Sequence, residues 1–357
     1  MKNLLLSLLR SALYGDSFER ELSPKEFEGV LLLAEEQTVF GLIFEILSKQ
    51  KIIGCEDLVF DSIGKIECIK LQNQLTNRIL VDFIQIMYKN GVDVMVVKGQ
   101  TIAGLYPNPS LRMSGDIDYL INKEYVCVKE SIEKTKCIDL PEKLILKEYA
   151  YIWKGIPFEL HKSLLDFACK KHQILWEHLV RTTWEEAYYL EIDNVKVRTL
   201  PPTLNAAYVF FHLFFHFIRG GVSLRQVCDW SMVLQKYRQV IDCESLHGIL
   251  VRFDMLNAYI AFGFILVENL GLSKDAFPFP LAFEYRSFKL RILTDIFKGG
   301  NFGRQNHKAK KNLWYKMETM AFVLRNCILY YKLAPSEMRM MVPLFIKINL
   351  RNLISRF

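Results

Sequence analysis

Apolar residues recur at helical spacing through residues 1–90. A capping pattern at 23–26 precedes hydrophobic side chains that return every three or four positions, and a stripe at every fourth position runs through 63–89. A further apolar stretch at 40–47 fits a short helix, and Asn90-Gly91 is typical of a helix end. We therefore predict that residues 1–90 form an N-terminal helical region.

Between residues 91 and 200, short β-branched or alternating segments replace the helical period. Several segments have the composition of strands and adjoin turn residues: 92–97, 116–121, 149–153, 156–161 and 195–200. The segments 100–105 and 123–134 fit helices. Strands mixed with helices in this way indicate an α/β or α+β core over residues 91–200.

The helical period returns after Pro201-Pro202 and continues through the rest of the sequence. Apolar helices are predicted first, then an irregular basic stretch, then a basic amphipathic tail of one or two helices: 204–218, 224–237, 243–253 and 258–270, then 276–312, then 313–357. Residues 201–357 therefore form the predicted C-terminal helical domain.

Composition narrows the class of protein. The chain has 357 residues, 51% of them hydrophobic and 24% charged, which is ordinary for a globular protein. Its net charge of +7 weakly favours an anionic ligand, and the absence of an aromatic and basic stripe argues against nucleic acid as a partner.

Arg10 interrupts the apolar N-terminus, and the internal apolar runs are too short for a membrane span. The eight cysteines form no C-x-x-C pair, so we interpret them as reduced thiols of a cytoplasmic protein.

Two aspartates stand at the start of the strand predicted over 116–121. Residues i and i+2 of a strand point to the same face, so the carboxylates of Asp116 and Asp118 would lie side by side and repel each other. A divalent cation removes this repulsion, and Mg²⁺ (or Mn²⁺) takes carboxylate oxygens while leaving positions for phosphate. The pair indicates a metal site rather than a merely solvated strand end.

Other residues supply the remaining parts that metal-dependent nucleotidyl transfer needs. Glu159 can provide a third carboxylate and shares a strand face with His161, the glycine turn Lys98-Gly99 can approach a triphosphate, and Lys98 and Arg112 can neutralise phosphate charge. Each has a simpler reading. Glu159 and Lys98 can be exposed at strand ends, His161 can be a core histidine, and Arg112 can pair with Asp116 or Asp118.

The run from Lys98-Gly99 through Arg112 to Gly115-Asp116-Ile117-Asp118 resembles the DNA polymerase β-type nucleotidyltransferase superfamily. Within it, the chain resembles the uncharacterised nucleotidyltransferases called nucleotidyltransferase family 5, over roughly residues 20–270. Three further elements match that family: Glu159-Leu160-His161, the helix with His212 and His216, and the helix with Arg225 and Asp229.

The resemblance implies an α+β fold, in which a nucleotidyltransferase core with a small mixed sheet is flanked by N-terminal helices and a C-terminal helical domain. It also implies Mg²⁺-dependent transfer of a nucleoside monophosphate from an NTP to a hydroxyl or phosphate of an unknown acceptor, with a small molecule favoured. Three roles follow for the site. The catalytic metal ligands are Asp116, Asp118 and Glu159; the nucleotide is bound by Lys98, Gly99, Gln100, Arg112 and Gly115; the acceptor pocket or site wall is formed by His161, His212, His216, Arg225 and Asp229.

One position departs from the superfamily pattern. Gln100 stands where the superfamily has Gly or Ser in contact with phosphate, which motivates the alternative of a catalytically inactive binding or regulatory protein. Two of the other matches also have simpler readings. His212 and His216 have a spacing that can bind zinc, although a place in the core or site wall is favoured in so apolar a helix. Arg225 and Asp229 can form a plain salt bridge along one helix.

Overall fold

The N-terminal part of the chain is helical, as its apolar period predicts. The structure is a computed structural model and describes residues 1–50, 54–123, 138–139, 148–300 and 313–354. Its first helices are α1 (Lys2–Tyr14), α2 (Pro24–Glu36), α3 (Phe40–Leu47) and α4 (Glu56–Lys89). The predicted capping box is present, because the Ser23 side chain accepts from the Glu26 N–H and the Glu26 side chain accepts from the Ser23 N–H. The long helix α4 begins earlier than residue 63, where the apolar stripe begins.

A mixed sheet follows α4. Its strands are β1 (Val94–Val97), β2 (Ile117–Ile121), β3 (Ile138–Asp139), β4 (Glu148–Trp153), β5 (Ile156–His161), β6 (Tyr188–Ile192) and β7 (Val195–Thr199). They lie in the order β3-β4-β5-β2-β1-β7-β6. The central strand β2 is antiparallel to β1 and parallel to β5. The α+β class is therefore confirmed. The sequence missed β3, which is two residues long, and β6, an edge strand in which only Ile192 is buried.

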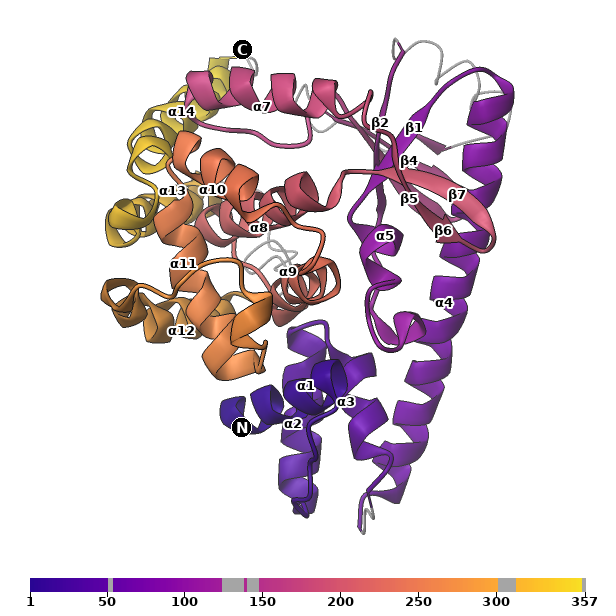
Figure 1. The fold of residues 1–357 in the computed structure, drawn as a ribbon. Helices are drawn as coiled ribbons and strands as arrows, with labels where there is room; N and C mark the ends of the chain where they lie inside the picture. Colours follow the sequence, from indigo (N-terminus) through magenta and orange to yellow (C-terminus); the bar gives the residue numbers. More distant parts are fainter. Residues whose placement is uncertain (51–53, 124–137, 140–147, 301–312, 355–357) are drawn as a thin grey trace.

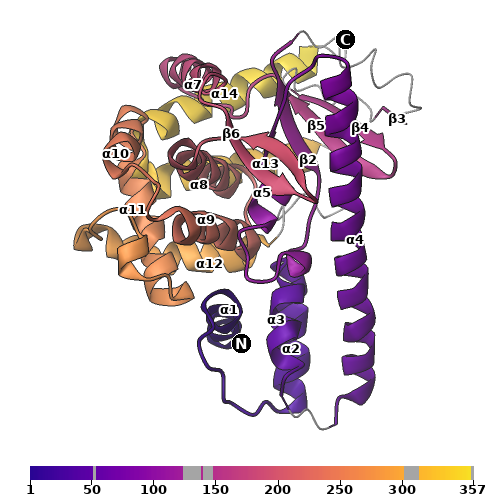
Figure 2. The ribbon, with the colours of Figure 1, turned by 45° about the vertical axis from the view of Figure 1, so that its right-hand side comes forward.

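The two faces of the sheet are covered differently. Alternate residues of the central strands, among them Tyr119 and Phe158, pack against Phe83 of α4, with ring centroids 5.0 and 4.8 Å from that of Phe83. The residues between them, including Asp118 and Glu159, face the other way. Figure 1 and Figure 2 show α4 along one side of the sheet and the C-terminal helices on the opposite side. The period of two thus places the acidic residues between the sheet and those helices.

The helical C-terminal part is larger than the sheet. Its helices, together with the short α5 after β1, are α5 (Gly99–Ala103), α7 (Lys170–Thr182), α8 (Pro202–Arg219), α9 (Leu224–Tyr237), α10 (Cys243–Arg252), α11 (Leu256–Phe264), α12 (Lys289–Gly299), α13 (Leu313–Leu329) and α14 (Pro335–Ile354). Short turns of helix are η1 (Pro109–Leu111), the π-helix η2 (Ile265–Leu270), η3 (Lys274–Ala276), η4 (Phe283–Phe288) and η6 (Tyr331–Leu333). The stretch 276–312 was predicted to be irregular, and α12 corrects this for 289–299. The predicted helix 123–134 lies almost wholly outside the described residues.

The N-terminal helices divide between the two cores. The second half of α4 packs on the sheet, whereas α1 to α3, with Ile66 of the first half of α4, share a hydrophobic core with the C-terminal helices. Arg10 of α1 donates from Nε to the carbonyl oxygen of Asn269 at 2.7 Å, which fixes α1 against η2. Within the described residues, no single helix has the length and apolar character to cross a membrane, although α10 and α11–η2, bent by 117° at their junction, pass that test as a pair.

Candidate active site

A strained turn at the end of β1 starts the site. Lys98 has φ 54° and Gly99 has φ 46°, in the left-handed region that non-glycine residues rarely occupy. A side chain at residue 99 would put its Cβ 3.3 Å from the carbonyl oxygen of Asp116. Glycine is therefore needed here for both conformation and space, and the turn brings residues 98–99 against the start of β2.

Two acids and a histidine meet on the neighbouring strands. The parallel register pairs Asp118 of β2 with Glu159 of β5, so their side chains lie next to each other on the same face. His161, two residues further along β5, brings Nε2 to 2.6 Å from Oδ1 of Asp118 and to 3.9 Å from Oε2 of Glu159. The ligand atoms of these residues all lie within 4.8 Å of one another. Oxygen and imidazole donors at this spacing fit a divalent cation.

Lys98 provides the positive charge next to these acids. Its Nζ lies 3.0 Å from Oδ1 of Asp118 and donates a hydrogen bond to Nε2 of His212 at 2.9 Å. Burial disfavours both charges, but the ion pair outweighs burial, so that the pKa of Lys98 is raised and the pKa of Asp118 is lowered. His161 contributes to the low pKa of Asp118 through its hydrogen bond.

Asp116 lies in the loop just before β2 rather than within the strand. The nearby carboxylate of Asp118, helped by burial, raises the pKa of Asp116 despite the opposing charge of Lys98. One lysine therefore does not fully compensate the negative charge of this cluster. The surplus negative charge is the electrostatic condition that a bound cation would relieve, so the residues fit the metal that the sequence predicts.

The paired histidines of α8 are neutral components of the wall. The Nε2 atoms of His212 and His216 are 3.1 Å apart. Burial, followed by the charge of Lys98, lowers the pKa of His212 well below its usual value and that of His216 to about 4. Because Lys98 donates to Nε2 of His212, that nitrogen acts as an acceptor and not as a charged donor.

Arg112 has a different partner from those expected. Its Nε and Nη2 donate to Oδ1 and Oδ2 of Asp229 at 2.7 and 2.8 Å, and Tyr106 donates to Oδ1 of the same carboxylate at 2.7 Å. Arg225 donates from Nη1 to the carbonyl oxygen of Met113 at 2.8 Å. The salt bridge expected along α9 is thus replaced by bonds that join α9 to the loop before β2.

These groups line one cavity of about 740 Å³ between the sheet and the C-terminal helices. The predicted site residues on its wall are Lys98, Gly99, Arg112, Gly115, Asp116, Asp118, Glu159, His161, His212, His216, Arg225 and Asp229. Gln100 is the exception. Its buried Nε2 donates to Oδ1 of Asn77 in α4 at 2.5 Å, so the structure gives it a contact with α4 in place of the expected nucleotide contact.

Comparison with known proteins assigns the chain to a family. The model of a family described as uncharacterised nucleotidyltransferase matches residues 23–270. The chain belongs to this family. One solved structure with a similar chain is an antigenic nucleotidyltransferase-like protein from Paracoccidioides brasiliensis, 12% identical with a TM-score of 0.33, and the match covers 55% of this chain and 92% of that chain. No curated protein matches.

In this member of the family, part of the cavity wall was not predicted from the sequence. It comes from the segment after β5, from the end of α8 and from the last two helices: Ser163, Leu164, Leu165, Asp166, Phe215, Arg219, Thr319 and Phe345. Arg219 carried a usable signal, because it follows His212 and His216 at helical spacing on the same face. The residues from α13 and α14 reach the site only through tertiary packing.

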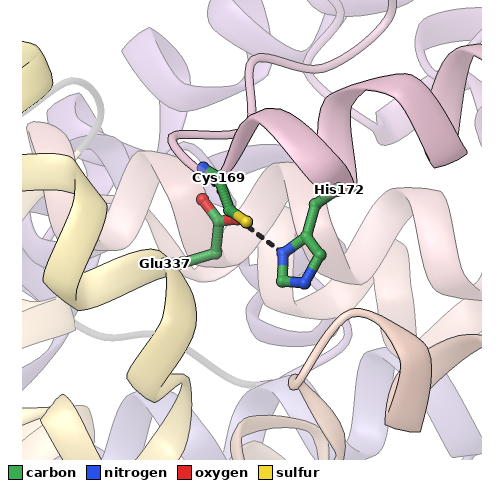
Figure 3. Close-up of side chains that lie close together, drawn as sticks. All are labelled: Cys169, His172 and Glu337. Carbon is green, nitrogen blue, oxygen red and sulfur yellow. Dashed lines mark hydrogen bonds and ion pairs between the residues drawn. The ribbon is translucent and has the colours of Figure 1, made fainter.

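A second group of metal-binding residue types lies outside the cavity of this nucleotidyltransferase-family chain. Figure 3 shows Cys169, His172 and Glu337 at the junction of α7 and α14. Glu337 accepts hydrogen bonds from the Ala168 N–H at 2.7 Å and the Cys169 N–H at 3.2 Å, and its Oε1 is 2.7 Å from Nδ1 of His172. The carboxylate therefore satisfies the N–H groups of the two residues that lead into α7 and fastens α14 to the start of that helix.

Proposed function

We propose that this chain transfers a nucleoside monophosphate from an NTP to a hydroxyl or phosphate of a small-molecule acceptor, with Mg²⁺ or Mn²⁺. The observation that carries the proposal is the parallel register of β2 and β5. It sets Asp118 beside Glu159 on the wall of a cavity of about 740 Å³ that Lys98 and Arg225 also line. Membership of a nucleotidyltransferase family supports the reaction class.

Asp118 and Glu159 would hold the metal, with Asp116 and His161 completing its surroundings. Bound there, the metal would neutralise charge that develops on the phosphate during transfer. The carboxylates are already gathered on one face of the sheet. Little rearrangement is therefore needed before the cation binds.

The chain's own residues bind the NTP and activate the acceptor. Lys98 and Arg225 bind the phosphates of the NTP, and Glu159 accepts the proton of the attacking hydroxyl. The acceptor oxygen forms a bond to the α-phosphorus, the bond from that phosphorus to the bridging oxygen breaks, and pyrophosphate leaves. The surrounding helices exclude water, which would otherwise compete with the acceptor.

Gln100 bonds to α4 and is not among the residues that line the cavity, which leaves the cavity open to a triphosphate. The alternative of a catalytically inactive binding or regulatory protein stays a prediction from the sequence. A cytoplasmic location and a small-molecule rather than nucleic-acid acceptor remain predictions from the sequence.

Transfer of label from α-labelled NTPs to a panel of hydroxylated and phosphorylated small molecules tests the proposal. Wild type is compared with Glu159→Gln, which keeps the shape of the side chain but removes its basicity. Glu191→Gln, an exposed glutamate on β6 of the same sheet, is the matched control. We expect label transfer in wild type and in the control and its loss in Glu159→Gln. The absence of both Mg-NTP binding and transfer in wild type would contradict the proposal.

A further inference from the structure

Two arginines, Arg219 and Arg225, line the cavity that holds the acidic cluster. Arg225 of α9 is bonded to Met113, on the loop that leads into β2 and Asp118. Arg219, the last residue of α8, donates from Nη2 to the carbonyl oxygen of Asp166, on the segment that follows β5 and its Glu159. Arg225 is thus bonded to the loop before β2 and Arg219 to the segment after β5. The two arginines therefore contact different parts of the site.

Arg219 contacts the surrounding protein, but one of its N–H groups has no hydrogen-bond partner among the described residues. Its guanidinium carbon lies 4.8 Å from the ring centroid of Phe215. Its Nε atom is buried and has no hydrogen-bond partner among the residues that the structure describes. Burial lowers the pKa of Arg219, although the carboxylates of Asp166 and Glu337 oppose this effect. A buried N–H that lacks an acceptor costs free energy, and an oxyanion in the cavity would recover it.

Arg219 lies on a later turn of α8 than the residue that faces the acids. Lys98 touches both Asp118 and His212, so His212 marks the turn of α8 that is close to the acids. Arg219 follows at the end of the helix, and its guanidinium lies over the ring of Phe215. Arg219 and His212 line the same cavity. The N–H group that lacks a partner in the described part of the chain therefore belongs to a cationic residue in the wall of the cavity that also holds the acids.

The NTP does not account for this group. In the proposed function the triphosphate is bound by Lys98 and Arg225. Arg219 is instead bonded to the segment after β5, the strand that carries Glu159, which is proposed to activate the acceptor. Building on the proposed function, we propose that the acceptor is a small hydroxylated molecule that also carries a phosphate or carboxylate group, and that Arg219 binds this oxyanion. A neutral alcohol would offer the guanidinium an acceptor but no opposing charge.

Titration calorimetry with inorganic phosphate and with acetate tests the inference. Each ion is titrated into wild type, Arg219→Gln and Arg219→Lys, first without nucleotide and then with Mg²⁺ and saturating α,β-methylene ATP. Arg286→Gln is the matched control, because Arg286 is an exposed arginine that also lies over an aromatic ring, that of Phe283. Circular dichroism shows whether each variant is folded. If Arg219→Gln does not fold, Arg219→Lys still tests the inference.

We expect phosphate, acetate or both to bind wild type and Arg286→Gln, with the better ion identifying the acceptor's group. Binding should persist in the presence of the ATP analogue and weaken at least tenfold in Arg219→Gln. Arg219→Lys should weaken it less, since it keeps the charge but loses the forked geometry. No binding of either ion to wild type, equal affinity in wild type and Arg219→Gln, or complete displacement by the analogue would overturn the inference. Failure of the analogue itself to bind would contradict the proposed function, while the titration without nucleotide would still test Arg219.

Discussion

His161 and His172 both place a ring nitrogen next to a buried carboxylate, but the two carboxylates differ in their other neighbours. The distances are nearly equal, 2.6 Å from Nε2 of His161 to Asp118 and 2.7 Å from Nδ1 of His172 to Glu337. Glu337 also accepts two backbone N–H groups, and it does not line the cavity. Asp118 lies beside a second acid on the wall of the cavity.

The difference shows that nearness of metal-binding atoms is a weak sign of a metal site. At Glu337 the protein supplies the donors that the charge needs, so a cation would have to displace hydrogen bonds. Beside Asp118, the carboxylate of Asp118 and then burial raise the pKa of Asp116, so a cation would relieve repulsion between these two acids. Uncompensated charge beside open space separates a candidate active site from a structural contact.

The largest effect should come from Asp118→Asn. Removal of this charge weakens the metal site and its hold on Lys98, so we expect nucleotidyl transfer to fall by about 10³-fold or more. Mn²⁺ affinity, measured by calorimetry, should fall with it. Asp193→Asn, in the exposed turn between β6 and β7, serves as the control and should retain both. Unchanged transfer in Asp118→Asn would contradict the assignment of the metal site to Asp118 rather than to a structural contact like that of Glu337.

Asp229 should behave like Glu337 although it lines the cavity, because Arg112 binds both of its oxygens. Burial opposes its charge, but Arg112 holds the pKa of Asp229 below its usual value. The ion pair therefore stabilises the protein above the ordinary aspartate pKa of about 3.9, and this stabilisation is lost as pH falls through the folded pKa.

Asp229→Asn should accordingly lower the free energy of unfolding by about 3–5 kcal/mol at pH 7, because it leaves the Arg112 charge buried without its partner. The difference from wild type should shrink in urea titrations as pH falls below about 4, because the carboxyl of the unfolded chain then binds a proton before the folded one does. Asp193→Asn should show neither effect. A constant difference between wild type and Asp229→Asn at every pH would contradict the assignment of this stabilisation to the ion pair.

A smaller effect is expected for Glu337→Gln. The amide keeps the shape of the side chain but loses one acceptor for the Ala168 and Cys169 N–H groups, so stability should fall by about 2 kcal/mol. Urea unfolding measures this change. Mn²⁺ affinity of the folded variant should stay within twofold of wild type. A tenfold loss of Mn²⁺ affinity would mean that the junction of α7 and α14 takes part in metal binding.

The smallest effect should come from Cys169→Ser. Cysteine is a soft ligand that suits Zn²⁺, so this ion is the most sensitive probe of the cluster in Figure 3. We expect Zn²⁺ affinity to change by less than twofold, because the carboxylate at its centre is already saturated. Tenfold weaker Zn²⁺ binding in Cys169→Ser would instead make the cluster a second metal site.

The sequence predicted the strands that carry the site better than it predicted which residues the site's side chains contact. The period of two placed Asp118, Glu159 and His161 on one face, because it depends only on local backbone geometry. The bidentate partner of Arg112 is Asp229, far along the chain, and the contact of Gln100 is Asn77 in α4. Both follow from how separate elements pack, which local patterns do not record.

Helix α7 was missed although the sequence held its signal. Its buried residues His172, Trp176 and Val180 follow one another at every fourth position. The polar character of the remaining residues concealed this stripe. The segment between β5 and α7 carries Asp166, so the missing helix also hid the surroundings of Arg219.

Thr319 and Phe345 place the last two helices in the cavity wall, although the family match ends at residue 270. The acids and part of the wall that faces them therefore lie in separate stretches of the sequence. Mutation within residues 313–354 can reshape the cavity while Asp118 and Glu159 stay in register. Under the proposed function, a change in these last two helices would alter which acceptor fits and leave the acids in place.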